Sequence, residues 1–241
     1  MIKNLSWDSQ FFGLNIGLYK GKTARKFQLK KFLKEFKKYK FDCVYVFLDP
    51  NDFKGIKEAG ENKFFLSDIR VIYELPREKW PAGQNSPPYQ ILNSRDKRKR
   101  SQVIGMSGKL SRTSRFYFDP KFRPKTKEMY EIWAEKIMND KRGAIILSFA
   151  GDHLSGFTGC KVEKDIGELV LVYVEGKFRG RGLGEEIIKN GLDWLVKNRV
   201  KKIIVKTQAR NIVANRLYQK TGFRVAENIL IYHVWKTRDE K

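Results

Sequence analysis

The sequence predicts a mixed α/β fold in which a central, mostly antiparallel sheet is flanked by helices. Three apolar segments, residues 143–150, 154–163 and 166–175, follow one another with only short turn sequences between them, which is typical of antiparallel hairpins. Segments in which apolar residues recur at helical spacing stand on either side of this series, at 127–138 and 187–195. Hydrophobic residues make up 41% of the 241 residues, so a packed core is available.

The N-terminal third adds a strongly amphipathic helix at residues 26–40. Its residues Leu29, Phe32, Leu33 and Phe36 fall at i, i+3, i+4 and i+7, and lysines occupy the other face, which we interpret as solvated surface. The same two periodicities predict further strands at 44–48, 68–75, 201–208 and 228–235 and further helices at 54–60 and 211–223.

A proline-rich stretch divides the chain. Residues 76–93 hold four of the seven prolines, and such punctuation is typical of a boundary between domains. We therefore expect a smaller N-terminal α/β domain at 1–93 and a larger domain at 94–241. The basic run at 95–100 is interpreted as the end of the linker.

The charge is strongly positive, since 50 lysine and arginine residues oppose 27 acidic residues and give a formal net charge of +23. This charge suits nucleic acid, an anionic membrane surface or phosphorylated small molecules, and it also suits a protein that is merely rich in lysine. Cys43 and Cys160 are isolated and match no metal-ligand spacing, so no metal is expected. Because no export signal and no membrane-length apolar run are found, a cytoplasmic location is expected.

A glycine-rich loop, Arg-Gly-Arg-Gly-Leu-Gly at residues 179–184, joins the strand at 166–175 to the following helix. A helix start carries unpaired backbone N–H groups and partial positive charge, and Arg179 and Arg181 add formal charge. This pattern favours a bound phosphate. Neither G-x-x-x-x-G-K-[ST] nor G-x-G-x-x-G is present, and a tight turn with surface arginines is the alternative.

The loop and a later block together resemble the GNAT acetyltransferase superfamily. The pattern R-x-x-G-x-G is present as Arg179, Gly182 and Gly184, and the block at 207–227 contains Asn, Ala, Leu-Tyr and Gly-Phe in the family's order. The resemblance covers about residues 140–235 and implies acetyl-CoA as cosubstrate. It implies that acetyl-CoA is bound by Leu171, Val172, Tyr173, Val174, Arg179, Gly180, Arg181, Gly182, Leu183, Gly184, Asn211 and Tyr218.

A narrower resemblance, to the dTDP-fucosamine acetyltransferases, is carried by the segments at 5–17, 114–122 and 206–218. Those enzymes acetylate the amine of a 4-amino-4,6-dideoxy sugar on a nucleotide diphosphate, and their N-terminal part is a smaller, incomplete companion to the GNAT domain. The resemblance implies a nucleotide-linked amino sugar as acceptor and a possible homodimer. It places Ser114, Arg115 and Tyr117 at the sugar-nucleotide site.

The chemistry requires a base for the acceptor amine and an acid for the leaving thiolate. By resemblance Tyr218 is the acid and Asn211 contacts the pantetheine arm. Asp68, at the start of the strand at 68–75, is the preferred base, and Glu175, just past the strand at 166–175, is its competitor. The alternatives are structural: Tyr218 as a core side chain and Asn211 as a helix N-cap.

Other functions remain open at this point. Within the superfamily, the acceptor could be a protein N-terminus or an aminoglycoside. From a different class, the charge and the interleaved basic and aromatic residues at 111–118 fit a nucleic-acid-binding module, although neither an RNP nor a KH pattern is present.

Overall fold

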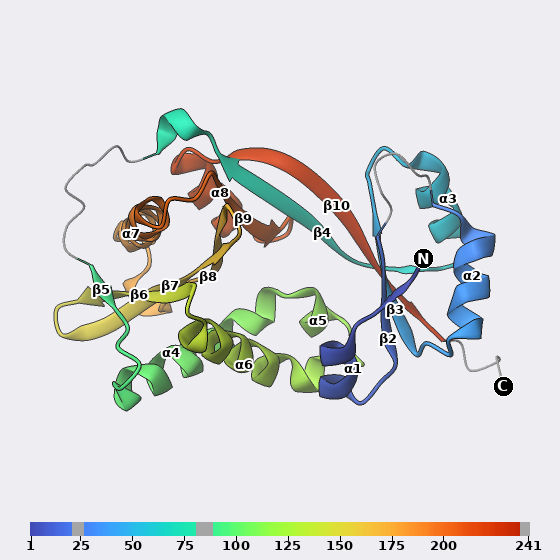
Figure 1. The fold of residues 1–241 in the computed structure, drawn as a ribbon, viewed down its shortest axis with the longest axis horizontal. Helices are drawn as coiled ribbons and strands as arrows, with labels where there is room; N and C mark the ends of the chain where they lie inside the picture. Colours follow the sequence, from blue (N-terminus) through green and yellow to red (C-terminus); the bar gives the residue numbers. More distant parts are fainter. Residues whose placement is uncertain (21–26, 81–88, 237–241) are drawn as a thin grey trace. The chain divides into compact units, whose positions relative to one another are not determined.

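The computed structural model describes residues 1–20, 27–80 and 89–236 (Figure 1). These residues fall into two compact units: the first lies within Met1–Val71 plus Glu227–Lys241, and the second within Ile72–Ala226. The division therefore falls inside two strands, β4 (Phe65–Leu75) and β10 (Arg224–Trp235). The domain boundary predicted at residues 93 and 94 differs from this division and stays a prediction.

In the first unit, a small sheet has the strand order β1-β2-β3-β10. β2 pairs with β3 in parallel, and β3 pairs with β10 antiparallel. The other elements of this unit are β1 (Lys3–Asn4), α1 (Ser6–Phe12), β2 (Ile16–Lys20), α2 (Leu29–Lys38), β3 (Cys43–Leu48) and α3 (Phe53–Glu61).

An aromatic core explains why this unit folds around α2. Phe32 and Phe36 are buried on the inner face of the helix and pack with Phe27 and Phe41. The predicted amphipathic helix is thus confirmed within the described residues. Its outer lysines are exposed, as expected: Lys30, Lys31, Lys34, Lys37 and Lys38.

The second unit holds the antiparallel series that the sequence predicts, with the strand order β4-β9-β8-β7-β6-β5. β5 to β8 pair antiparallel with their neighbours, and β9 joins β8 in parallel. Its strands are β5 (Gln90–Ile91), β6 (Gly143–Ala150), β7 (His153–Glu163), β8 (Ile166–Val174) and β9 (Lys202–Gln208). Its helices and helical turns are η1 (Arg77–Lys79), α4 (Lys97–Leu110), η2 (Ser111–Thr113), α5 (Arg115–Phe118), η3 (Arg123–Lys125), α6 (Thr126–Asn139), η4 (Gly176–Phe178), α7 (Leu183–Lys197) and α8 (Ile212–Lys220).

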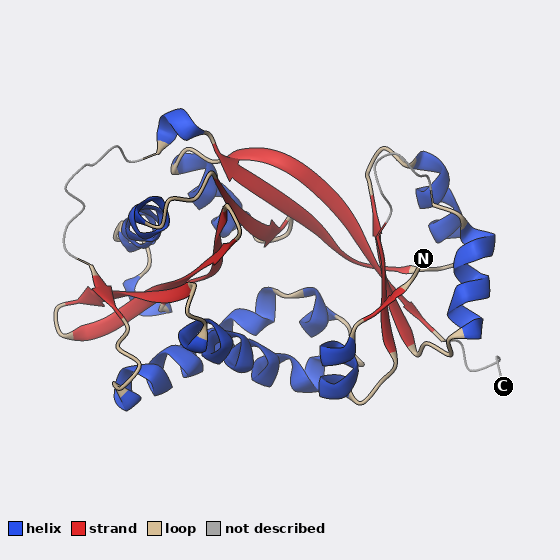
Figure 2. Cartoon of the chain, in the orientation of Figure 1, coloured by secondary structure: helices blue, strands red, loops and turns tan. Residues whose placement is uncertain are grey.

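Helices cover both faces of the β6–β8 part of this sheet. Figure 2 shows α4 and α6 on one side and α7 on the other. The approach of α7 is close, because a Cβ built on Gly191 would lie 2.8 Å from Leu169 Cδ2. The prediction of a mixed, mostly antiparallel sheet flanked by helices is confirmed.

One sequence interpretation is wrong. The basic run at 95–100 is not the end of a linker, because α4 begins inside it at Lys97 with Asp96 as N-cap; the Lys99 N–H donates to Asp96 Oδ1. The helix was not predicted because its buried face is built from Val103, Ser107 and Gly108. That face has too few large apolar residues to produce a helical pattern.

Two kinds of functional feature are absent from the described residues. No helix among them has the length and apolar character needed to cross a membrane. No group of three or more His, Cys, Asp or Glu side chains among them is arranged to hold a metal ion.

Candidate active site

Strand β8 separates from β9 halfway along its length. The pairs between the two strands run from Ile166–Lys202 to Leu169–Val205, although β8 continues to Val174 and β9 to Gln208. Among the described residues, β8 from Val170 onward therefore has no pairing partner on its β9 side. Backbone N–H and C=O groups along this edge are left to bind a ligand.

A β-bulge in β8 stands at the point of separation. Gly159 of β7 lies opposite Leu171 while the next residue, Cys160, lies opposite Leu169, so Val170 is the extra residue. A bulge of this kind changes which face the following side chains point to. Leu169 packs toward α7, whereas Leu171 lies with Ile137 of α6 around Gly159.

The loop after β8 needs glycine for its backbone conformation. Gly180 and Gly182 have φ angles of +76° and +80°, in the left-handed region that other residues rarely adopt. Gly182 is the N-cap of α7. Gly184 has a different role, because a Cβ there would lie 3.3 Å from Leu217, where α7 packs on α8.

Unpaired N–H groups and arginines meet at this loop. Within the described chain, the N–H groups of residues 180–184 donate to no backbone or side-chain acceptor, whereas Glu185 and Glu186 donate to Gly182 O. Arg179 Nε donates to Val174 O at 3.0 Å, which ties the loop to the end of the unpaired segment. A helix start with free N–H groups and nearby guanidinium groups is an anion site, which supports the predicted phosphate.

The turn from β9 into α8 is held by Asn215. Its Nδ2 donates to Gln208 O at 3.0 Å, Ala209 O at 3.2 Å and Asn211 O at 2.8 Å, and its Oδ1 accepts from the Tyr73 hydroxyl at 2.8 Å. Sequence reasoning missed Asn215, since an Asn inside a helix carries no signal by itself. Asn211 is the N-cap of α8 and accepts from the Ala214 N–H, as the structural alternative predicted.

These features agree with the comparison with known families. A sequence model of the acetyltransferase (GNAT) family matches residues 110–223. Residues 110–223 are a GNAT acetyltransferase domain. The prediction of this family is confirmed for these residues, and the family implies acetyl transfer from acetyl-CoA.

The similar proteins include a polysaccharide biosynthesis protein and several mycothiol acetyltransferases. The spore coat polysaccharide biosynthesis protein SpsD of Bacillus subtilis is 21% identical over 83% of this chain and 73% of its own length. A mycothiol acetyltransferase of Corynebacterium efficiens is 35% identical over 91 residues, which are 36% of this chain and 30% of that protein. The chain thus spans less than a third of that relative.

A solved structure shows the same fold over most of the chain. The GCN5-related N-acetyltransferase of Sphaerobacter thermophilus superimposes with a TM-score of 0.65 at 13% identity. The match covers 91% of this chain and 73% of that one.

Tyr218, the predicted acid, lies in α8 of the GNAT domain and is buried, with 5% of its surface exposed. Its ring centroid is 5.8 Å from that of Tyr73 and 6.0 Å from that of Phe223. Burial raises the pKa of the Tyr218 hydroxyl, and the nearby Tyr73 adds to the increase. The hydroxyl therefore stays protonated at neutral pH, as an acid must.

A carboxylate and an ammonium group meet just beyond β8. Lys109 Nζ, on α4, donates to both oxygens of Glu175, at 3.0 and 2.9 Å. The hydrogen bond from Lys109 holds the pKa of Glu175 below its ordinary value of 4.5, and the pKa of Lys109 is raised in return. Tyr173 contacts the same pair, and burial raises its pKa. Glu175 is consequently ionised at neutral pH.

Asp68, the predicted base, lies inside β4 and not at its start, because the strand begins at Phe65. It is buried, with 3% exposed, and belongs to the first unit. Its role as base is not decided by this placement and stays a prediction.

The predicted acceptor residues lie around the short helix α5. Ser114 is buried and caps the helix, accepting from the Tyr117 N–H at 3.3 Å. The Arg115 guanidinium lies 4.1 Å from the Phe116 ring centroid. These contacts explain the local structure, and binding of a sugar nucleotide by these residues stays a prediction.

Proposed function

We propose that the protein transfers the acetyl group of acetyl-CoA to the amine of a nucleotide-linked amino-deoxy sugar. The observation that carries the donor half is the unpaired edge of β8 from Val170 to Val174, which leads directly into the glycine loop. An extended ligand that has amide groups along one arm and a pyrophosphate directly beyond that arm matches both features.

In this proposal the pantetheine arm lies along the unpaired edge and the pyrophosphate lies on the loop at residues 179–184. Backbone N–H groups of Leu171–Val174 stabilise the negative charge that develops on the thioester oxygen during attack. Tyr218 donates a proton to the leaving thiolate, and Asn211 contacts the arm. Holding amine and thioester at attack distance supplies much of the remaining acceleration.

Two carboxylates compete as the base that removes a proton from the acceptor amine. Asp68 is supported by the family resemblance. Glu175 is supported by its position directly after the unpaired segment of β8, in the same compact unit as Tyr218, although its lowered pKa makes it a weaker base. We favour Glu175 on these physical grounds.

The acceptor class is supported by similarity that extends beyond the GNAT domain. SpsD, whose name assigns it to polysaccharide biosynthesis, resembles 83% of the chain, whereas the mycothiol acetyltransferase resembles only 36%. The segments at 5–17 and 114–122, which lie outside the donor loop, carry the resemblance to amino-sugar acetyltransferases.

The test is a screen for release of free CoA thiol with acetyl-CoA and a panel of nucleotide-linked amino-deoxy sugars. The same nucleotide sugars with a hydroxyl in place of the amine serve as controls. We expect turnover with at least one amino sugar and none with its hydroxyl partner. Turnover only with aminoglycosides or N-terminal peptides would replace the acceptor class, and tight, salt-sensitive RNA binding without any transfer would favour the nucleic-acid-binding alternative.

A further inference from the structure

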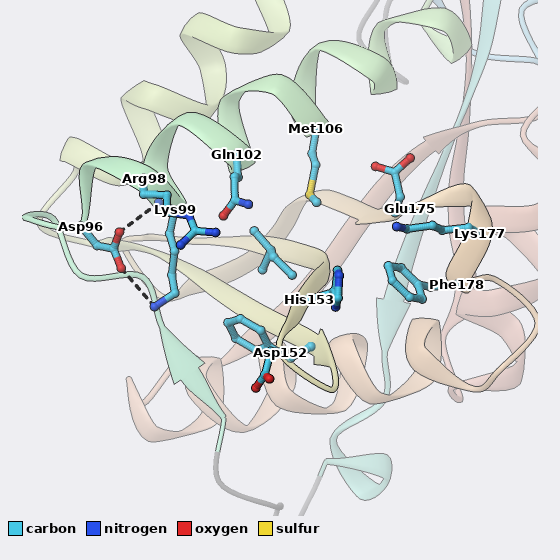
Figure 3. Close-up of a pocket in the computed structure, with 12 residues that line it drawn as sticks. Asp96, Arg98, Lys99, Gln102, Met106, Asp152, His153, Glu175, Lys177 and Phe178 are labelled. Carbon is cyan, nitrogen blue, oxygen red and sulfur yellow. Dashed lines mark hydrogen bonds and ion pairs between the residues drawn. The ribbon is translucent and has the colours of Figure 1, made fainter.

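A cavity of about 810 Å³ opens beside the end of β8 (Figure 3). Its walls come from three places in the second unit: the outer face of α4, the turn between β6 and β7, and the segment just after β8. Its size is typical of sites for small organic ligands, which occupy about 300–1,000 Å³. None of the residues so far assigned to acetyl-CoA lines it.

Cations stand on two walls of this cavity. Arg98 and Lys99 of α4 lie on one wall and Lys177 lies on another. Lys99 is paired with Asp96 at 3.0 Å, whereas Arg98 and Lys177 form no ion pair within the described part of the chain. Three carboxylates also line the cavity: Asp96, which is paired with Lys99, Glu175, which is paired with Lys109, and the exposed Asp152. Arg98 and Lys177 are therefore offset in part by Asp152.

Two of these lysines each have an aromatic ring nearby. Lys177 Nζ lies 4.9 Å from the ring centroid of Phe178, and Lys99 Nζ lies 6.0 Å from that of Phe149. Both rings line the cavity and are half-buried, so each leaves some surface open. Rings of this kind stack on planar bases, and adjacent cations bind phosphates.

Glu175 connects this cavity to the chemistry. It lines the cavity and is the residue that follows β8, whose last residue is Val174. A ligand whose phosphates bind in this cavity therefore lies beside an ionised carboxylate that can accept a proton from its positively charged amine.

We infer that this cavity holds the nucleoside diphosphate of the acceptor, with Arg98 and Lys177 on the diphosphate and Phe178 or Phe149 against the base. The assignment of the nucleotide to the acceptor rests on the proposed function. Binding of a nucleotide in this cavity is supported by the cations and aromatic rings that line it. It lies apart from Ser114, Arg115 and Tyr117, which do not line it.

The test is calorimetric titration of the full chain with dTDP and UDP, in the presence of saturating CoA so that the donor site is filled. We expect binding of at least one nucleotide, and a Kd at least about tenfold higher in the double variant Arg98→Gln/Lys177→Gln, which loses two charge-assisted contacts. Separate titrations with inorganic pyrophosphate and with the free nucleosides measure how much of the affinity comes from the cations and how much from the rings.

The matched control is Lys141→Gln/Arg142→Gln, which removes two exposed charges at the start of β6 outside the cavity. The nucleotide Kd of this control should stay within about twofold of the unsubstituted protein's Kd, because charges outside the cavity act on the ligand only at long range and are screened by salt. Thermal unfolding of both double variants confirms that they fold.

Three outcomes overturn the inference: no binding at ~1 mM nucleotide, equal losses in both double variants, or nucleotide binding only when CoA is absent. Failure of the proposed function has a different signature. In that case the nucleotide binds and the cavity variant loses it, but no nucleotide-linked amino sugar is acetylated.

Discussion

The proposed donor segment and the proposed acceptor cavity are built in opposite ways. The donor segment, residues 170–184, is one continuous stretch that uses mainly backbone groups: an unpaired strand edge, a bulge and a helix start. The acceptor cavity uses side chains of α4, of the β6–β7 turn and of the stretch after β8. A site made of contiguous backbone leaves a pattern in the sequence, whereas a site made of distant side chains leaves none until the chain folds.

The largest effect is expected at Tyr218, which belongs to the donor side. Tyr218→Phe should lower kcat by about 100-fold or more while the KM for acetyl-CoA changes by less than about twofold, because only the proton donor is removed. Steady-state kinetics measures both. Tyr130→Phe, another buried tyrosine of this unit, serves as control, and an unchanged kcat in Tyr218→Phe would assign Tyr218 to the core alone.

The second largest effect is expected at the residue that removes the proton from the acceptor amine. If Glu175 removes the amine proton, Glu175→Gln should lower kcat by about tenfold to 100-fold, and Asp68→Asn should lower it much less. The reverse order, with both variants folded, would return the role to Asp68.

Binding of acetyl-CoA by the donor loop should depend on the backbone conformation of its glycines, whereas a methyl group added where the conformation allows it should have little effect. Gly182→Ala disfavours the left-handed conformation by about 1–2 kcal/mol, so the free loop should relax to another conformation. Restoring the binding conformation should then raise the Kd for acetyl-CoA by about tenfold. Gly176→Ala is the matched control, because a Cβ at Gly176 meets nothing within 4 Å and its φ is not positive. Equal effects of the two substitutions on calorimetric binding would contradict the account.

The smallest expected effect is a shift in titration. Lys109 lowers the pKa of Glu175, so Lys109→Met should move that pKa upward, toward 4.5, and the carboxylate should protonate at a higher pH. We expect this upward shift to be small, because the pair is partly exposed to solvent. Carbon-13 NMR of the Glu175 carboxylate measures it, and no upward movement would remove Lys109 as the cause.

The sequence alone predicted the parts of the fold whose residues form local patterns. The β6–β8 series, the loop at 179–184 and the cap at Asn211 follow from alternation, glycine spacing and capping chemistry. Helix α4 did not, because its buried face is built from small and polar residues such as Ser107. The role of Lys109 beside Glu175 and the contacts of Asn215 with Tyr73 depend on residues distant in sequence, so only the folded chain reveals them.

Amide hydrogen exchange with and without acetyl-CoA tests the donor site most directly. The account predicts that acetyl-CoA slows exchange at Val170–Val174 and at residues 180–184, while amides of α3 in the first unit stay unchanged. Protection confined to other segments, with the β8 edge and the loop exchanging as fast as before, would contradict it.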